Sequence, residues 1–126
     1  MRLKKLLPLS LGLVFLAGCA TTITNLTPRE QIRNANGLYP FEVALDTTQQ
    51  TLRKDSIQPS VIIGLESYPM RPTPMLKNRW ETLIPIPPDK EYVNYQFKFD
   101  YEYHSIPQRK SGSKLSPPYQ LRLKDR

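Results

Sequence analysis

The chain has 126 residues, with 18 basic and 11 acidic side chains, 13 prolines, five glycines, one cysteine and one histidine. This length suits a single domain, and a lone cysteine excludes an internal disulfide. One histidine and scattered glycines leave little for a histidine-based metal cluster, a serine–histidine–aspartate relay or a phosphate loop, so we expect no enzyme, metal site or cofactor.

The first predicted element is a lipoprotein signal peptide over residues 1–18. Three of the first five residues are basic, an apolar run covers residues 6–16, and the run ends in the box Leu16-Ala17-Gly18-Cys19. A basic start, an apolar stretch and small residues before the cleavage point are typical of a secretory signal. The apolar run is shorter than the ~20 residues of a transmembrane helix. The alternative is an ordinary secretory signal in which Cys19 has no special role.

Lipidation of Cys19 would anchor the protein to a membrane. We expect the peptidase to recognise Leu16, Ala17 and Gly18, the thiol of Cys19 to carry a diacylglycerol, and the new amino terminus usually to be acylated, for example with palmitate. Two or three chains anchor stably, because each buried methylene contributes ~0.8 kcal/mol. Ala20 stands where an aspartate often retains lipoproteins at the inner membrane. We therefore expect the cell envelope, and the outer membrane if the cell has two.

The basic charge of the chain gives little support for nucleic-acid binding. Cleavage before Cys19 would remove three of the 18 basic residues and leave 15 against 11 acidic ones. An envelope address argues further against a nucleic-acid partner. We expect the partners to be the membrane, through the lipid anchor, and an unidentified envelope protein or a glycan.

The chain beyond residue 20 is predicted to form short strands separated by turns. Twelve of the 13 prolines lie there, and their spacing leaves no room for long helices. Residues 21–26 are predicted as a first edge strand or a short tether. Residues 27–37 form a polar connection that ends in the turn signal Asn36-Gly37.

Alternating apolar residues predict two strands in the middle of the chain. The buried face of the first comprises Tyr39, Phe41, Val43 and Leu45. The second covers residues 60–66, and one of its faces comprises Val61, Ile63 and Leu65. A short return through Tyr68 and Met70 then leads into a proline-rich turn over residues 72–74.

The second half of the chain predicts three strands and one loop. Residues 79–86 form a strand that leaves the sheet at its prolines, with a face of Trp80, Thr82, Ile84 and Ile86. The longest strand covers residues 91–104, with an apolar face of Val93, Tyr95, Phe97, Phe99, Tyr101 and Tyr103. Residues 105–116 are predicted as a basic loop, and Tyr119, Leu121 and Leu123 mark a final strand. We expect Phe97 and Phe99 to be buried with Trp80 packed nearby.

Six or seven short strands with regular turn signals indicate an all-β protein, a single antiparallel β-sandwich. We assign residues 27–126 to this domain. Residues 19–26 are the lipidated amino terminus with its tether or edge strand, and residues 1–18 are the cleaved signal peptide.

Two neighbouring segments of the sequence carry a family resemblance. Residues 80–90 read WETLIPIPPDK, and residues 95–101 read YQFKFDY. With this tryptophan-led strand, proline-rich turn and tyrosine-x-phenylalanine-x-phenylalanine strand, the chain resembles early-set immunoglobulin-like domains, including the glycogen-binding modules attached to starch-active enzymes. The resemblance implies an immunoglobulin-like sandwich and, as an alternative function, carbohydrate binding. Such modules bind sugars through exposed tryptophans, whereas Trp80 is the only tryptophan here and its strand would bury it.

Candidate catalytic residues are few. Asp100 and Glu102 lie two positions apart on the polar face of the longest strand, and paired carboxylates catalyse glycoside hydrolysis. Alternating charges are also typical of a solvated sheet face, which is the interpretation we favour for this pair. His104 is expected at a solvated strand end.

Two sets of residues are candidate contact surfaces. Arg109, Lys110 and Lys114 lie in the predicted loop, where they would contact an acidic partner or an anionic membrane surface; the alternative is a solvated loop. Tyrosines suit sugar or protein contacts, because they bury area and keep a hydroxyl wet; the alternative is core packing. The set comprises Tyr92, Tyr95, Tyr101, Tyr103 and Tyr119.

The leading functional hypothesis is a non-enzymatic, lipid-anchored envelope protein that acts as a structural or protein-interaction module. The alternative is a membrane-anchored carbohydrate-binding module. A sugar binder needs at least two aromatic rings exposed on one face, whereas an interaction protein needs an open sheet edge or an exposed apolar patch.

Overall fold

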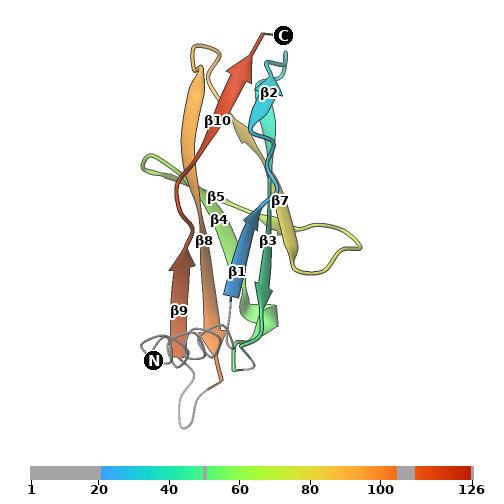
Figure 1. Cartoon of the computed structure of the whole chain (residues 1–126), viewed down its shortest axis with the longest axis vertical. Helices are drawn as coiled ribbons and strands as arrows, with labels where there is room; N and C mark the ends of the chain where they lie inside the picture. The colour runs from blue at the N-terminus through green and yellow to red at the C-terminus, as the bar shows by residue number, and fades with distance from the viewer. Residues whose placement is uncertain (1–20, 50, 105–109, 126) are drawn as a thin grey trace, which may run out of the picture.

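The computed structural model describes residues 21–49, 51–104 and 110–125. The strands form two sheets packed face to face (Figure 1), and the described residues contain a single helical turn, the 3-10 helix η2 (Lys54–Ser56). The predicted all-β sandwich is confirmed. The predicted signal peptide and Cys19 lie outside the described residues.

The first sheet has four antiparallel strands in the order β1-β3-β7-β6. They are β1 (Thr21–Asn25), β3 (Leu38–Thr47), β6 (Arg71–Pro72) and β7 (Arg79–Pro85). Of the two alternatives for residues 21–26, the structure shows an edge strand, because β1 pairs with β3 along its whole length.

The second sheet has the order β2-β10-β8-β4-β5, with β9 also paired to β8. Its strands are β2 (Glu30–Ile32), β4 (Gln58–Ile63), β5 (Glu66–Pro69), β8 (Tyr92–Tyr103), β9 (Lys110–Leu115) and β10 (Tyr119–Lys124). β10 and β9 follow one another along the same edge of β8, with β10 beside residues 92–95 and β9 beside residues 98–103. β2 runs parallel to β10.

The strand order of the two sheets matches the order found in immunoglobulin-like sandwiches. In that fold strands A, B, E and D form one sheet and strands C, F and G the other, to which a C′ strand can be added. Here β1, β3, β7 and β6 take positions A, B, E and D, while β4, β5 and β8 take positions C, C′ and F. Position G is divided between β9 and β10, and β2 adds a short strand beside β10. The described residues form ten strands, whereas six or seven were predicted. The difference arises because β9 and β10 share position G, β2 is an added strand, and the short segments β5 and β6 are also paired.

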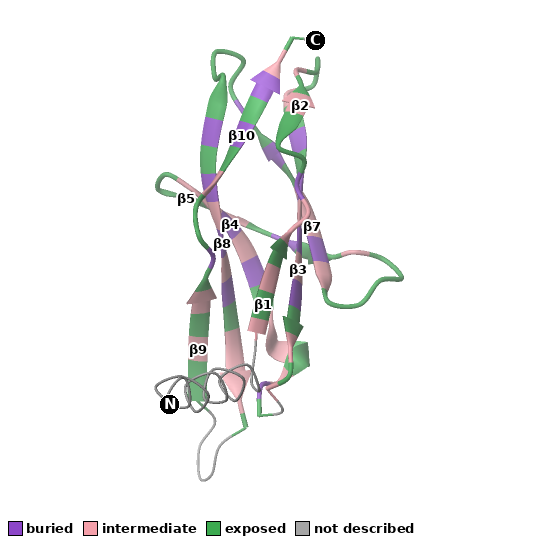
Figure 2. Ribbon diagram, viewed as in Figure 1, coloured by how far each residue is buried: buried purple, intermediate pink, exposed green. Residues whose placement is uncertain are grey.

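The core consists of the alternating apolar residues that face the interior of the sandwich, seen as buried bands along β3 and β8 in Figure 2. Its members are Tyr39, Phe41, Val43, Leu45, Val61, Met70, Trp80, Ile84, Ile86, Val93, Tyr95, Phe97, Phe99, Leu121 and Leu123. The rings of Trp80 and Phe99 meet edge to face with centroids 5.9 Å apart. The predicted burial of Phe97 and Phe99 near Trp80 is confirmed.

The predicted strand over residues 60–66 extends too far at its C-terminal end. β4 stops at Ile63, and Gly64 and Leu65 form the hairpin turn to β5. Gly64 has a φ of 59°, in the left-handed region that glycine adopts without steric cost. The alternation places Leu65 on the buried face, which is wrong, because the chain has already turned and this side chain is fully exposed.

Residues 105–116 were predicted as a loop, and this prediction is wrong for the second half of the segment. Lys110–Leu115 forms β9, which pairs antiparallel with the last six residues of β8. Lysine, serine and glycine in this segment give no apolar alternation, so the strand has no local signal and forms because β8 offers an edge. Residues 105–109, which include Arg109, lie outside the described residues.

Ser116 joins β9 to β10, and its side chain is buried. Its Oγ accepts a hydrogen bond from the Phe97 N–H at 2.8 Å and donates one to the Pro117 carbonyl at 2.9 Å. We predict that Ser116→Ala lowers the free energy of unfolding by about 1–3 kcal/mol, because the Phe97 N–H would lose its side-chain partner inside the protein. Urea denaturation measures this, with Ser113→Ala on the exposed face of β9 as the control. An equal loss in both variants would contradict the assignment.

Candidate functional site

The sandwich is elongated (Figure 1), and we name its two ends the anchor pole and the distal pole. The anchor pole is the end where β1 begins and β8 ends: Thr21 pairs with Thr47, and Tyr103 pairs with Lys110 and bridges to Leu52. The distal pole carries the end of β10 (Figure 1). The 12 residues of β8 run between the poles, a distance of roughly 40 Å at ~3.3 Å per residue.

The distal pole is held together by Arg33. Its guanidinium donates hydrogen bonds to the carbonyls of Pro88 and Lys90 at 2.7 and 2.8 Å, and it bonds the Asp125 carboxylate at 2.9 Å. Asp125 is exposed, so the ion pair itself contributes little. The two carbonyl contacts fix the turn before β8 against the segment that follows β2.

An exposed apolar surface covers the outer face of the four-stranded sheet near the distal pole. Leu38 lies opposite Pro85 and Pro40 opposite Leu83 in the β3–β7 ladder, so the four side chains form a block. All four are exposed, and Leu83 is 55% exposed. We call this block, made of Leu38, Pro40, Leu83 and Pro85, the apolar face. Because large exposed apolar patches mark interaction sites, we take the apolar face as a candidate contact surface.

A recess opens beside the apolar face and shares Pro85 with it. Its volume is about 350 Å³, and its wall is mostly apolar. Tyr68 and Tyr92 both line it, and Lys90 and Asn94 supply its polar groups. The recess lies where β5 and the first residues of β8 approach the end of β7. The apolar face and the recess together are the main candidate site.

Sequence reasoning missed most of this site. Leu83 and Pro85 occupy the outward positions of a strand whose inward positions were predicted correctly, so the signal was available as apolar residues on both faces. Tyr92 was included in the candidate tyrosine set, and it is the most exposed member, at 47%. Tyr68 lines the recess because β5 pairs with β4 in the register that places Tyr68 opposite Val61, and the sequence does not specify this register.

The two described lysines of the predicted contact surface lie on β9. Lys110 and Lys114 are four residues apart on the same face of this strand, with Gly112 between them. Lys110 is exposed and Lys114 half-buried. Neither forms an ion pair within the described part of the chain, which contains every acidic side chain of the protein. Arg109, the third member of the predicted set, lies outside the described residues.

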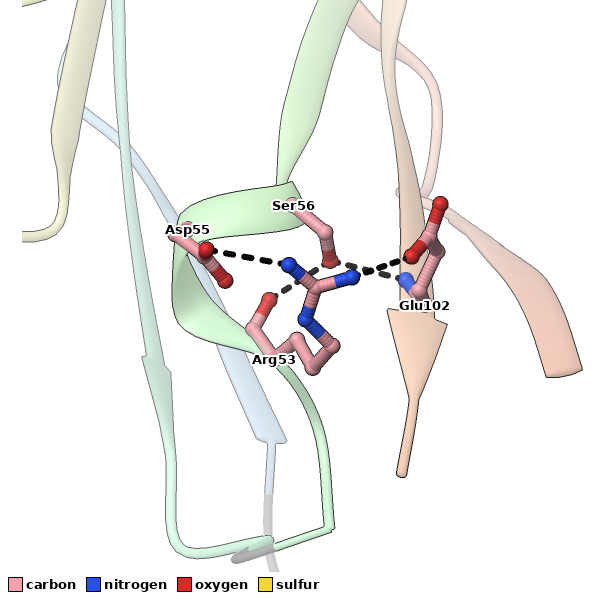
Figure 3. A network of polar contacts seen from close by, with 4 residues as sticks. All are labelled: Arg53, Asp55, Ser56 and Glu102. Atoms are coloured by element: carbon pink, nitrogen blue, oxygen red, sulfur yellow. Dashed lines mark hydrogen bonds and ion pairs between the residues drawn. The ribbon is translucent and has the colours of Figure 1, made fainter. Parts of the chain in front are cut away.

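The carboxylates of Asp100 and Glu102 serve structural contacts. Glu102 bonds the Arg53 guanidinium at 2.5 Å, and Arg53 also pairs with Asp55 at 3.1 Å (Figure 3). Ser56 Oγ donates to the Arg53 carbonyl at 2.6 Å and accepts from the Glu102 N–H at 2.8 Å. Asp100 lies 3.8 Å from Lys98. This network fastens η2 to the end of β8, and the side chains of Glu102 and Asp100 are 45% and 52% exposed.

His104 follows β8 at the anchor pole. Its side chain is exposed, and its backbone N–H donates to the Thr51 carbonyl at 2.7 Å. No group of three or more histidine, cysteine, aspartate or glutamate side chains suited to a metal ion occurs among the described residues.

The other tyrosines of the candidate set pack inside the sandwich or at its anchor pole. Asn25 Nδ2 donates to the Tyr95 hydroxyl at 2.8 Å, and burial raises the pKa of Tyr95. The hydroxyls of Tyr101 and Tyr103 form a hydrogen bond with an O–O distance of 3.2 Å, and this bond, together with burial, raises the pKa of Tyr101 to about 12. Core packing therefore explains Tyr95, and mutual packing explains the pair at the anchor pole.

Comparisons with protein-family models, curated proteins and solved structures found no match to this chain. In the described residues no helix has the length and apolar character needed to cross a membrane.

Proposed function

We propose that this protein is a non-enzymatic, lipid-anchored module of the cell envelope that presents its distal half to another envelope protein. The observation that carries this proposal is the apolar face, in which four exposed apolar residues lie opposite one another in the register of β3 and β7. A partner that covers this face removes its apolar surface from water, and this burial favours binding by about 25 cal/mol per Å².

The position of β1 supports the anchored arrangement. Thr21 is the first residue of β1, so the chain between it and Cys19 spans at most about 7 Å. A lipid on Cys19 would therefore hold the anchor pole against the bilayer. The apolar face and the recess, in the distal half, would then point away from that membrane toward a partner.

A charge in the apolar face tests this function. Leu83→Glu should reduce partner recovery at least tenfold, because an interface would bury the new carboxylate without a counter-charge. The matched control is Leu76→Glu in the loop before β7, where the leucine is 48% exposed and lies outside the apolar face.

The measurement is cross-linking in intact cells, followed by recovery of the tagged full-length protein from detergent-solubilised envelope. The proposal requires one cross-linked species that Leu83→Glu removes and Leu76→Glu retains. Equal recovery with both variants would assign the apolar face to plain surface.

The recess favours the alternative, a membrane-anchored carbohydrate-binding module, on one observation. Tyr68 and Tyr92 line the same hollow, where Tyr92 is exposed and Tyr68 is half-buried, so two rings are available for contact with a sugar. Trp80, the only tryptophan, is buried and supplies no sugar platform. Under this alternative the wild-type protein binds isolated envelope polysaccharide and Tyr92→Ala does not; under the leading proposal neither protein binds it.

A further inference from the structure

We propose that the open edge of β9 takes up an extended acidic segment of a partner protein as an added β-strand. This inference rests on the interaction role proposed above but concerns a different surface, at the anchor pole. Strand addition at an exposed sheet edge is a general mode of peptide recognition, in which the backbone supplies affinity and the side chains supply specificity.

The edge formed by β9 and β10 is only half occupied. β2 pairs with β10 over Arg122–Lys124, so the distal half of this edge already has an added parallel strand. β9 pairs with β8 on one side and has no strand partner on the other within the described residues. A strand added beside β9 would extend the same edge of the sheet that β2 covers beside β10.

The hydrogen-bond alternation shows which backbone groups of β9 face outward. The Ser116 N–H donates to the Phe97 carbonyl. Because bonding residues alternate in an antiparallel pair, the backbone groups of Lys114, Gly112 and Lys110 also bond to β8. The backbone groups of the alternate residues, Ser111, Ser113 and Leu115, then point to the open edge. The other edge of β8 agrees with this phase, because the Glu102 carbonyl accepts a bond from the Arg53 N–H there.

The side chains of β9 select for acidic residues. Lys110 and Lys114 flank Gly112 on one face, and neither has an ion-pair partner among the described residues. In a strand that pairs with β9, two residues lie opposite these lysines. These two residues are also four positions apart and lie on the same face of their strand. Opposite charges directly across a strand pair stabilise the pairing.

The same lysines disfavour a second copy of this chain as the occupant. Two β9 strands paired antiparallel about Gly112 would place Lys110 of each copy opposite Lys114 of the other. Like charges directly opposite destabilise a strand pair, and lysines on edge strands are a common protection against self-pairing. The occupant is therefore a different segment with the opposite charge.

Binding of a synthetic peptide tests the proposal. The probe is a short fluorescent peptide of β-branched residues with two glutamates four positions apart, and its partner is the same peptide with lysines at those positions. We expect the full-length protein in detergent to bind the glutamate peptide roughly tenfold more tightly, as measured by anisotropy. Lys110→Glu combined with Lys114→Glu should reverse this preference.

A proline variant separates strand addition from simple charge attraction. Ser113→Pro removes an outward N–H and leaves the bonds to β8 in place, as proline is tolerated on the open side of an edge strand. It should lower the affinity at least tenfold while leaving the melting temperature close to that of wild type. The Leu83→Glu variant should bind the peptide as the wild type does. The peptide experiment can therefore fail or succeed independently of the test of the apolar face.

Three outcomes would overturn the proposal. Equal binding by Ser113→Pro would show that the backbone edge is not used. Binding of vesicles of anionic phospholipid, but not of the peptide, would assign the lysines to the membrane surface. Concentration-dependent dimerisation that Ser113→Pro abolishes would make a second copy the occupant.

Discussion

Phe97→Ala should lower the free energy of unfolding by about 3–5 kcal/mol. Phe97 lies in the middle of β8, is fully buried, and packs against the rings of Tyr95 and Tyr119 at centroid distances of 5.6 and 5.9 Å. Truncation removes apolar contacts and leaves a cavity that the two sheets cannot fill. Since domains of this size are stable by only ~5–15 kcal/mol, the loss is a large share of the total.

Lys98→Ala is the matched control for this variant. Lys98 is the next residue of β8 and points to the opposite, solvated face, where its ion pair with Asp100 has an N–O distance of 3.8 Å. Such exposed pairs contribute little, so the control should change stability by no more than ~0.5 kcal/mol. Urea denaturation of both variants measures the difference. Wild-type-like stability of Phe97→Ala would show that the inner face of β8 does not form the core.

Cys19→Ser should abolish membrane anchoring. Without the thiol no diacylglycerol is attached, and we expect the lipoprotein peptidase to leave the precursor uncut. Loss of the acyl chains removes the ~0.8 kcal/mol per methylene that holds the protein at the bilayer. Incorporation of labelled palmitate measures lipidation directly, and it should fall to background in the variant. Unchanged incorporation would overturn the lipoprotein assignment.

Cell fractionation tests the second part of the anchoring prediction. With Ala20 next to Cys19, the wild-type protein should be recovered with outer-membrane markers in a cell that has two membranes. Recovery with inner-membrane markers would contradict this address without affecting the prediction of lipidation. Ser116→Ala, which does not touch the signal peptide, should fractionate as the wild type does.

The strands with strong alternation were predictable from sequence alone. Residues 39–45 and 91–104 carry apolar side chains at every second position, as do residues 79–86 apart from Thr82, and a half-buried strand has this two-residue period. Because the period also identifies the inward face, the burial of Phe97 and Trp80 followed from the same pattern. The β-sandwich class followed from the number and spacing of such strands.

The short edge strands were not predictable, and they bear on function. β2 and β9 contain mainly polar residues and have no apolar period of their own. They are strands because β10 and β8 present unpaired backbone groups, and such pairing depends on what lies beside the segment in space. The open edge at Lys110 and Lys114 therefore appeared only with the tertiary structure.

The amino-acid sequence by itself determined the inward faces of the long strands, the scarcity of catalytic side chains and the expected lipidation at Cys19, since each depends on local order or composition. Only the tertiary structure decided which outward residues meet. The apolar face joins Leu38 to Pro85 and Pro40 to Leu83 across some 40 to 50 positions of sequence, through the register of β3 on β7. Register is set by the packing of both sheets together, so no single segment of sequence encodes it.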